Sequence, residues 1–206
     1  MKWWAAMTEK ERMLNGELYI SSDKELVLER KLAKQFMDEF NFEEKDIQKR
    51  MDLVKKQFKK VGSNCYITAP LYIDYGSNIT VGDNFYANFD CIFLDVNEII
   101  ISDNVMFGPR VSLFTATHPI DKDVRNIPLE YGVKIMIGNN VWLGGNVVVN
   151  PGVTIGDNTI VGSGSVVTKD IPSDVIAAGN PCKVIRKITD EDKLFWEKKK
   201  HEYYQK

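Results

Sequence analysis

Two histidines are the side chains of this sequence best suited to move a proton near neutral pH. His118 lies in the segment Thr115-Ala116-Thr117-His118-Pro119, and His201 lies in the lysine-rich stretch 198–202. Because that stretch is strongly polar, we expect His201 to be solvated. His118 can act as a general base toward a hydroxyl group, or it can hydrogen-bond locally within its own loop. The surrounding sequence has to decide between these two interpretations.

The three cysteines show no catalytic, metal-binding or disulfide pattern. Cys65, Cys91 and Cys182 are odd in number, scattered, and lack CxxC or HxxxH spacing. This argues against a disulfide framework and against a zinc site. Neither Cys91 nor Cys182 has a histidine nearby in sequence, so a covalent acyl-enzyme is not expected. We interpret Cys91 and Cys182 as packing residues, and we expect the protein to reside in a reducing compartment.

The segments that must position His118 follow a six-residue period. The frame appears at Val81, Ala87 and Phe93, again at Ile101, Phe107 and Leu113, and then without interruption at Ile137, Leu143, Val149, Ile155, Val161 and Val167. Gly-Asp-Asn and Gly-Asn-Asn turns, whose residue types tolerate positive φ, separate the short apolar segments. Three short strands and three turns give an 18-residue triangular coil. Stacked coils of parallel strands, with these apolar residues inside, predict a mainly β protein built as a parallel β-helix.

The frame breaks once, between Leu113 and Ile137. Continuing it would place Pro119, Arg125 and Tyr131 in the apolar interior. An unpaired arginine cannot fill such a core. We therefore expect residues 114–134 to form a loop extruded from the coil. Long loops on rigid scaffolds commonly carry function, and this one contains His118.

Helices are expected on both sides of the repeats, which divide the chain into residues 1–60, 61–187 and 188–206. In the first part, Thr8 with Glu11 forms a capping box and Asp23 can cap a second helix. The apolar face of that second helix holds Leu26, Ala33, Phe36, Met37 and Phe40, and a third helix carries the stripe Ile47, Met51, Val54 and Phe58.

A last helix is expected over residues 188–206, where Thr189 with Asp192 resembles a capping box. The open end of a β-helix exposes unpaired backbone groups. We therefore expect Leu194, Phe195 and Trp196 of this helix to cover that end.

The amino-acid composition limits the classes of partner that this protein is expected to bind. The 206 residues include 27 Lys plus Arg against 29 Asp plus Glu, a net charge of −2, so charge does not recommend nucleic acid. With 44% hydrophobic and 27% charged residues the chain resembles an average folded protein. No apolar run approaches the roughly 18 residues that span a bilayer, and the patch Trp3 to Met7 is shorter than a secretory apolar segment. A cytoplasmic protein without membrane partner is expected.

Several motifs together resemble a known family. They are MTEKERML, GELY, YGSNITVGDNFYANF, ATHP, IGNNVWLGGNVVVNPGVTIGDN, GSGSVVTKDIP and AAGNPCKVIRKI. The chain is similar to the hexapeptide-repeat acyltransferases, in the branch of maltose and galactoside O-acetyltransferases. The resemblance implies a left-handed β-helix and a homotrimer with acetyl-CoA held between subunits. It also implies acetyl transfer to a hydroxyl of a small sugar of the maltose, glucose or galactoside type, without a metal.

The resemblance also implies roles for individual residues. His118 matches the catalytic histidine, the general base that later protonates the departing thiolate. Positions lining the acceptor pocket are matched by Asp74, Asn88, Asp95, Glu130, Tyr131 and Trp142. Asn88 has an alternative interpretation as a turn residue of the coil, and Trp142 is equally explained as a packed trimer-interface aromatic. After GELY the chain reads Ile20-Ser21-Ser22-Asp23, which does not clearly match the acceptor-binding aspartate of the family and leaves the sugar open.

Cofactor positions of the family map onto the later repeats. They are Gly145, Ser163, Thr168, Lys169, Lys183 and Arg186. Cations there would make charge-assisted bonds to the 3′-phosphate and pyrophosphate of coenzyme A, although each lysine is also explained as a solvated surface residue. Lys183 stands where relatives have arginine, so a bidentate contact would become a point charge.

Three alternatives remain open. A related branch acetylates antibiotic hydroxyls on the same scaffold. A zinc lyase of the carbonic anhydrase type needs three histidine ligands, which His118 could supply only on a threefold axis. A non-catalytic β-helix used for assembly would have no need of the loop histidine or of the basic residues near the end of the repeats.

Overall fold

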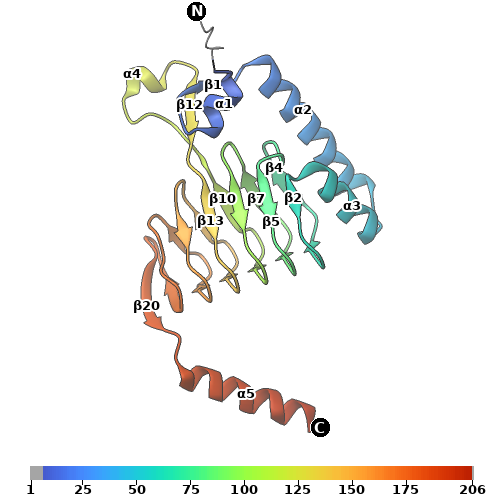
Figure 1. Cartoon of the computed structure of the whole chain (residues 1–206), viewed down its shortest axis with the longest axis vertical. Coiled ribbons are helices and arrows are strands. Elements are labelled where there is room, and N and C mark those ends of the chain that lie inside the picture. The colour runs from blue at the N-terminus through green and yellow to red at the C-terminus, as the bar shows by residue number, and fades with distance from the viewer. Residues whose placement is uncertain (1–6, 206) are drawn as a thin grey trace, which may run out of the picture.

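The computed structural model describes residues 7–205, so residues 3–6 of the apolar N-terminal patch lie outside the described part. Parallel strands stack into a left-handed β-helix, with helices over its first coil and one helix beyond its last (Figure 1). The expected fold class is confirmed. None of the described helices combines the length and the apolar character needed to cross a membrane.

Three sheets form the walls of the triangular coil, and all pairs between successive coils are parallel. Sheet I contains β2 (Lys60–Val61), β5 (Ile79–Val81), β8 (Ile99–Ile101), β13 (Ile135–Ile137) and β16 (Thr154–Ile155). Sheet II contains β3 (Tyr66–Ile67), β6 (Tyr86–Ala87), β9 (Met106–Phe107), β14 (Trp142–Leu143), β17 (Ile160–Val161), β19 (Val175–Ala178) and β20 (Lys183–Lys187). Sheet III contains β4 (Leu71–Ile73), β7 (Cys91–Leu94), β10 (Ser112–Phe114), β15 (Val148–Val149) and β18 (Val166–Val167).

The six-residue frame fills the interior, as expected. Leu113 pairs with Phe93 in the preceding coil and with Val149 in the following one, and all three side chains are fully buried. The turn residues Asn84, Asn104, Asn140 and Asn158 have φ between 53° and 58°, the left-handed region that asparagine tolerates better than most residues. Local turn chemistry and interior packing therefore agree at each coil.

Coil length differs between the two halves of the β-helix. Ile137 pairs with Ile155, a step of 18 residues, whereas Val61, Val81 and Ile101 pair at steps of 20. The additional residues lie where sheet III turns into sheet I, in segments 74–78 and 95–98. At the same corner of the third coil the chain leaves the repeat altogether at residue 115. We call these three segments, 74–78, 95–98 and 115–134, the loop corner.

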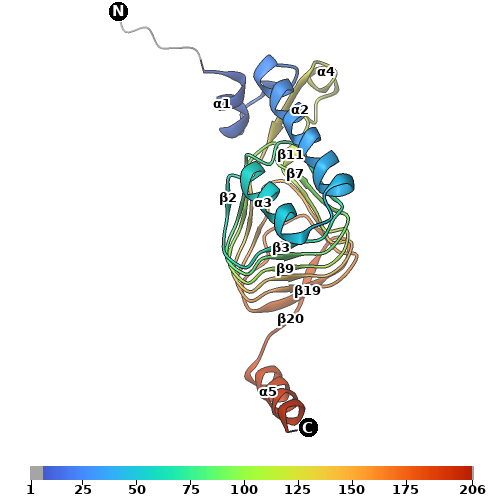
Figure 2. The ribbon, with the colours of Figure 1, turned by 90° about the vertical axis from the view of Figure 1, so that its right-hand side faces the viewer.

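The N-terminal segment closes the first coil. It comprises α1 (Glu9–Leu14), β1 (Tyr19–Ile20), α2 (Lys24–Asp38), the π-helical turn η1 (Glu39–Glu43) and α3 (Ile47–Gln57). The capping box at Thr8 and the cap at Asp23 are confirmed. Figure 2 shows α2 and α3 lying across the end of the coil. Buried Asn41 of η1 donates to Leu71 O at 2.9 Å and accepts from Leu71 N at 2.8 Å. Its side chain therefore satisfies the backbone groups of Leu71 at the free edge of β4.

The extruded loop has its own secondary structure, which the repeat pattern did not predict. It contains β11 (Ala116–Thr117), α4 (Lys122–Arg125) and β12 (Leu129–Gly132). Strand β12 pairs antiparallel with β11 on one side and with β1 of the N-terminal segment on the other. This three-stranded sheet joins residues that are more than one hundred positions apart in sequence.

The C-terminal helix α5 (Asp190–Tyr204) forms with its capping box, but its expected position was wrong. Leu194, Phe195 and Trp196 are 64%, 53% and 67% exposed, and the helix projects away from the coil (Figure 1). Strand β20 pairs antiparallel with β19 and lies at the edge of sheet II. The segment from Ile188 onward then leads α5 outward, so the helix does not lie over the interior of the last coil.

Candidate active site

The loop corner brings His118 next to a carboxylate that the N-terminal segment holds in place. His118 Nε2 lies 3.9 Å from Glu130 Oε2, and the imidazole is 57% exposed. Tyr19 of β1 is opposite Glu130 in the small sheet and donates its hydroxyl to Glu130 Oε1 at 2.8 Å. Burial, and then the hydrogen bond with Glu130, raise the pKa of Tyr19, so this hydroxyl keeps its proton. Glu130 therefore has one oxygen bound to Tyr19 and one facing His118.

Tyr131 lies on the same hairpin, opposite Thr117 in the pairing of β11 with β12. It is half-buried and adjoins both Glu130 and the strand that leads to His118. The loop thus supplies His118, Glu130 and Tyr131 from one hairpin, as their positions at its two ends suggested.

Asp74 adds a second carboxylate to this region. Its pKa is raised to about 6, first by desolvation and then by the charge of Glu130, while the Arg30 guanidinium acts in the opposite direction. A carboxyl group of this kind can accept or donate a hydrogen bond near neutral pH. The charges of Asp74 and Glu130 therefore act on one another at the loop corner.

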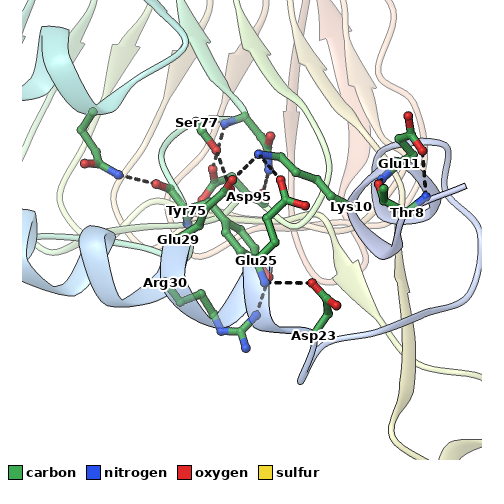
Figure 3. A network of polar contacts seen from close by, with 12 residues as sticks. Thr8, Lys10, Glu11, Asp23, Glu25, Glu29, Arg30, Tyr75, Ser77 and Asp95 are labelled. Atoms are coloured by element: carbon green, nitrogen blue, oxygen red, sulfur yellow. Dashed lines mark hydrogen bonds and ion pairs between the residues drawn. The ribbon is translucent and has the colours of Figure 1, made fainter.

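Arg30 ties helix α2 to the loop corner. Its Nη1 donates to Tyr75 Oη and its Nη2 to the carbonyl oxygen of Ser21, both at 2.6 Å. Figure 3 shows the guanidinium of Arg30, which lies in the middle of α2, beside Tyr75. Arg30, Tyr75 and Tyr19 were not among the residues predicted from the sequence. A signal existed for Arg30, because it lies between Leu26 and Ala33 on the buried face of α2, where a charged residue is unusual.

Asp95 occupies a different position from the one we expected. Its side chain is fully buried and accepts backbone N–H groups of Asp74, Tyr75 and Asn78 at 3.1, 2.8 and 3.3 Å. Burial raises its pKa to about 7, while the hydrogen bond from Tyr75 opposes that rise. The carboxylate therefore shapes segment 74–78 from within and presents no exposed oxygen to a sugar. Asp95 positions Asp74 and Tyr75 rather than lining the pocket itself.

Three of the remaining predicted residues share a second corner, between sheets II and III. Asn88 N–H donates to Phe107 O, Gly108 N–H to Leu143 O and Gly144 N–H to Val161 O, so successive coils are in register there. Gly145 and Ser163 belong to the same column. A β-carbon at Gly144 would lie 2.6 Å from Ser163 Oγ, so the coils approach closely at this corner. The Asn88 amide oxygen accepts the N–H of Phe89 at 2.8 Å.

The cationic residues lie toward the C-terminal coils. Thr168 and Lys169 are exposed and follow β18, which lies two coils after β10, the strand that precedes the His118 loop. Lys183 and Arg186 are exposed on β20. The Arg186 guanidinium makes a bidentate pair with Asp192, at 2.6 and 2.8 Å, and this contact lowers the pKa of Asp192 to about 2.

Trp142 lies on the outer face of sheet II, away from the loop corner. It is 47% exposed and stands in register between Met106 and Ile160 of the neighbouring coils. Its neighbours on this face are therefore apolar side chains of the same sheet.

The predicted site residues thus fall into two groups on one chain. His118, Glu130 and Asp74 belong to the loop corner, whereas Asn88, Gly145 and Ser163 belong to the opposite end of sheet III. The extended segment 110–115, which contains β10, separates the corners by about 16 Å. Within residues 7–205 no group of three His, Cys, Asp or Glu side chains is arranged to hold a metal ion.

Comparison with known proteins gives consistent matches along the chain. Residues 12–62 match the family model of the maltose acetyltransferase hexapeptide capping motif, and residues 134–169 match that of the bacterial transferase hexapeptide, six repeats. A galactoside O-acetyltransferase of Escherichia coli strain K12 is 46% identical over 191 residues, which cover 92% of this chain and 94% of that protein.

Two solved structures are similar over nearly the whole fold. The crystal structure of a maltose O-acetyltransferase from Clostridium difficile 630 has a TM-score of 0.88 and 52% identity, covering 90% of this chain and all of that one. A galactoside acetyltransferase in complex with coenzyme A has a TM-score of 0.87 and 46% identity, covering 91% of this chain and 94% of that one.

Proposed function

Because this chain belongs to the hexapeptide-repeat acetyltransferases of the maltose and galactoside O-acetyltransferase type, we propose that His118 activates a hydroxyl of a small sugar for attack on acetyl-CoA. The chain is an acetyl-CoA-dependent O-acetyltransferase, with acetyl-CoA as a substrate. The observation that carries the finer proposal is the His118–Glu130 contact in a loop that the N-terminal segment holds through Tyr19.

The chemistry follows from these groups. The imidazole of His118 accepts the proton of the acceptor hydroxyl while its oxygen forms a bond to the thioester carbonyl carbon. The tetrahedral intermediate then expels the thiolate of coenzyme A, which receives the proton from the imidazolium. Glu130, 3.9 Å away, stabilises the imidazolium between these two steps. Asn88 is proposed to donate its amide N–H to the developing oxyanion.

We further propose that the enzyme is a homotrimer with its sites between subunits. The two groups of site residues lie at different corners of one chain, so a second copy is needed to bring them together. The outer face of sheet II supports such an association, since its strands carry an in-register row of apolar side chains. This outer row consists of Tyr66, Tyr86, Met106, Trp142, Ile160 and Ile176.

Coenzyme A is proposed to lie along the corner that contains Gly145 and Ser163, where short side chains leave its pantetheine unobstructed. Its phosphate groups would then reach Thr168, Lys169, Lys183 and Arg186. The bidentate contact of Arg186 with Asp192 shows that the guanidinium fork is held in a fixed orientation. In the proposed complex the Arg186 guanidinium binds a phosphate group of coenzyme A, either in place of Asp192 or together with it.

The acceptor is proposed to be a neutral small sugar. Asp74 and Glu130 can accept hydrogen bonds from sugar hydroxyls, and Tyr131 offers a half-buried ring beside them. We propose a cytoplasmic location as well, because Cys65, Cys91 and Cys182 are all free thiols.

Thiol release from acetyl-CoA tests the proposal. The panel contains maltose, glucose, a galactoside and an antibiotic with a free hydroxyl, each compared with a reaction that lacks acceptor. The proposal expects release that depends on a sugar. Release with the antibiotic but with none of the sugars would overturn the sugar assignment, and release that His118→Ala leaves unchanged would overturn the role of the histidine.

A further inference from the structure

Helix α5 carries large apolar side chains that its own coil does not cover. Leu194, Phe195 and Trp196 are more than half exposed, and Tyr203 and Tyr204 are 73% and 78% exposed. Every described residue of the helix except Asp192 is exposed. Both ribbon views show the helix separated from the three sheets (Figures 1 and 2). Exposed apolar groups in such number on one short element indicate a surface that is covered in the working protein.

The helix is held in this position rather than hanging from a loose linker. Its first turn is closed by the capping box of Thr189 with Asp192, and Asp192 is also bound by the Arg186 fork of β20. The backbone N–H of Ile188 donates to Asp174 O at 2.8 Å, which fixes the exit from the last coil. These contacts direct α5 away from its own sheet II and keep its apolar side chains available to another surface.

The distribution of these side chains around the helix favours a protein surface over a membrane. Leu194, Phe195 and Trp196 are consecutive, so they point about 100° apart and together cover roughly 200° of the circumference. Tyr203 lies near the side of Trp196, and Tyr204 points away from Phe195. A membrane surface binds helices that have one wide, continuous apolar face. Helix α5 has no such face, because Lys198 and Lys199 lie between its apolar side chains.

A second copy of this chain offers a surface of matching chemistry. The apolar outer row of sheet II, defined above, runs along the coil axis through six strands spaced about 4.8 Å apart, so it is about 24 Å long. Helix α5 has 15 residues and is therefore about 22 Å long. Next to this row, at the corner between sheets I and II, exposed carboxylates form a parallel line. They are Asp83, Asp103, Asp157 and Asp174.

Two lysines of α5 complement this line of carboxylates. Lys193 and Lys200 are exposed on one side of the helix, next to Trp196, whereas Lys198 lies between Leu194 and Phe195. A helix placed along the outer row with Phe195, Trp196 and Tyr203 against sheet II therefore has Lys193 and Lys200 at its side, where they can face the aspartates. Because the contact joins different surfaces of the two copies, it is head-to-tail, and three such contacts can close into a ring.

We propose that α5 is an intersubunit arm that docks on the outer face of sheet II of a second copy. The inference rests on the homotrimer proposed above and adds the element that holds it together. It also assigns Trp142 to the surface that the arm covers, one of the two roles that the sequence left open.

Sedimentation velocity over a dilution series tests the arm. The variant is Leu194→Gln/Phe195→Gln/Trp196→Gln, in which glutamine preserves helix propensity. The matched control is Phe42→Gln, since Phe42 is 64% exposed but lies at the other end of the molecule. We expect the triple variant to dissociate at a concentration at least about tenfold higher than wild type and the control. Circular dichroism checks that the coil stays folded, as α5 does not pack against it.

A photocrosslink identifies the occupant directly. Benzoylphenylalanine replaces Trp196, and the chain is prepared with natural nitrogen and with nitrogen-15, mixed after unfolding and refolding. The arm predicts crosslinks between light and heavy chains that map to strands of sheet II. Crosslinks confined to one chain, or vesicle binding by wild type that the triple variant loses with its oligomer unchanged, would overturn it.

The two proposals fail in distinguishable ways. If wild type is a monomer that still transfers acetyl groups to sugar, the proposed trimer and the proposed arm are both contradicted, whereas the enzymatic function is supported. If wild type is an oligomer and the triple variant dissociates no more readily, only the arm falls.

Discussion

The repetitive coil and the loop corner obey different rules, although the same chain builds both. In the coil, Ile155 packs against residues one coil away, 16 to 18 positions along the chain. At the loop corner, Tyr19 and Glu130 are 111 positions apart and Arg30 and Tyr75 are 45 apart. The structure of the coil can therefore be predicted from local sequence, whereas the site depends on contacts between segments that are far apart in the chain.

The difference also separates stability from activity. Interior side chains of the coil are apolar and close-packed, so their contribution is to the free energy of unfolding. The loop corner carries polar groups that are partly buried and whose pKa values are displaced, which is typical of functional regions. Substitutions in the two regions should consequently change different measurable quantities, and the following predictions test that separation.

The largest effect is expected from His118→Ala. Removal of a general base lowers turnover by about 10² to 10⁴, while the binding of acetyl-CoA and the melting temperature stay close to wild type. Steady-state kinetics with the best acceptor, together with calorimetric binding of coenzyme A, measure the two quantities. His201→Ala is the control, because His201 is exposed on α5 and its loss should leave turnover unchanged. Weakened coenzyme A binding in His118→Ala would contradict the assignment.

The coil should respond in the opposite way to Ile155→Ala. Ile155 is fully buried, so its truncation costs about 2–5 kcal/mol of unfolding free energy through lost burial and a cavity. Its neighbour Thr154 points outward in the same strand, and Thr154→Ala should change stability by less than about 0.5 kcal/mol. Denaturant unfolding checks both. Equal effects of the two substitutions would mean that the interior is not organised by the six-residue frame.

Asp74→Asn tests the electrostatics of the loop corner through pH. The pKa of Asp74 is raised to about 6 from 3.8, so between these values the folded chain binds more protons than the unfolded chain. Stability contributed by this group therefore falls as pH rises from about 4 to 6 and is constant above. The variant should gain stability relative to wild type over that window, by about 1–3 kcal/mol at pH 7. Thermal unfolding from pH 4 to 8 measures the difference, and a pH-independent difference would contradict the raised pKa.

The smallest effect concerns the cationic edge of the coil. Arg186→Ala should raise the Michaelis constant for acetyl-CoA by about tenfold, since a charge-assisted bond to the 3′-phosphate is lost. An acetyl-CoA analogue without the 3′-phosphate should show no such increase. Similar increases for both donors would mean that Arg186 does not contact that phosphate.

The loop shows where sequence reasoning reached its limit. Arg125 in the apolar frame was enough to predict that residues 114–134 leave the coil, because burial of an unpaired cation is costly. Nothing in the periodicity indicated that β12 would pair with β1, since strands of two to four residues carry almost no pattern. The same reason explains why the family resemblance supplied His118 and Glu130 while Tyr19 and Arg30 went unnoticed.

Asp95 and α5 show two further limits. A carboxylate in a polar segment is compatible with a pocket or with a buried turn, and only the backbone N–H groups of Asp74 and Tyr75 around it decided for the turn. Consecutive Leu194, Phe195 and Trp196 were expected to cover the open end of the coil, and they are exposed instead. The direction of the helix, however, depends on the Arg186–Asp192 pair and the exit at Ile188, which are tertiary contacts.

The sequence by itself determined the triangular coil, because a six-residue apolar period with asparagine and glycine turns has one compact solution in which every interior position is apolar. Tertiary structure alone decided which carboxylate faces His118, which one is buried, and where the last helix points. Those outcomes depend on hydrogen bonds and ion pairs between distant segments, whose partners are fixed by three-dimensional position and leave no periodic trace in the chain.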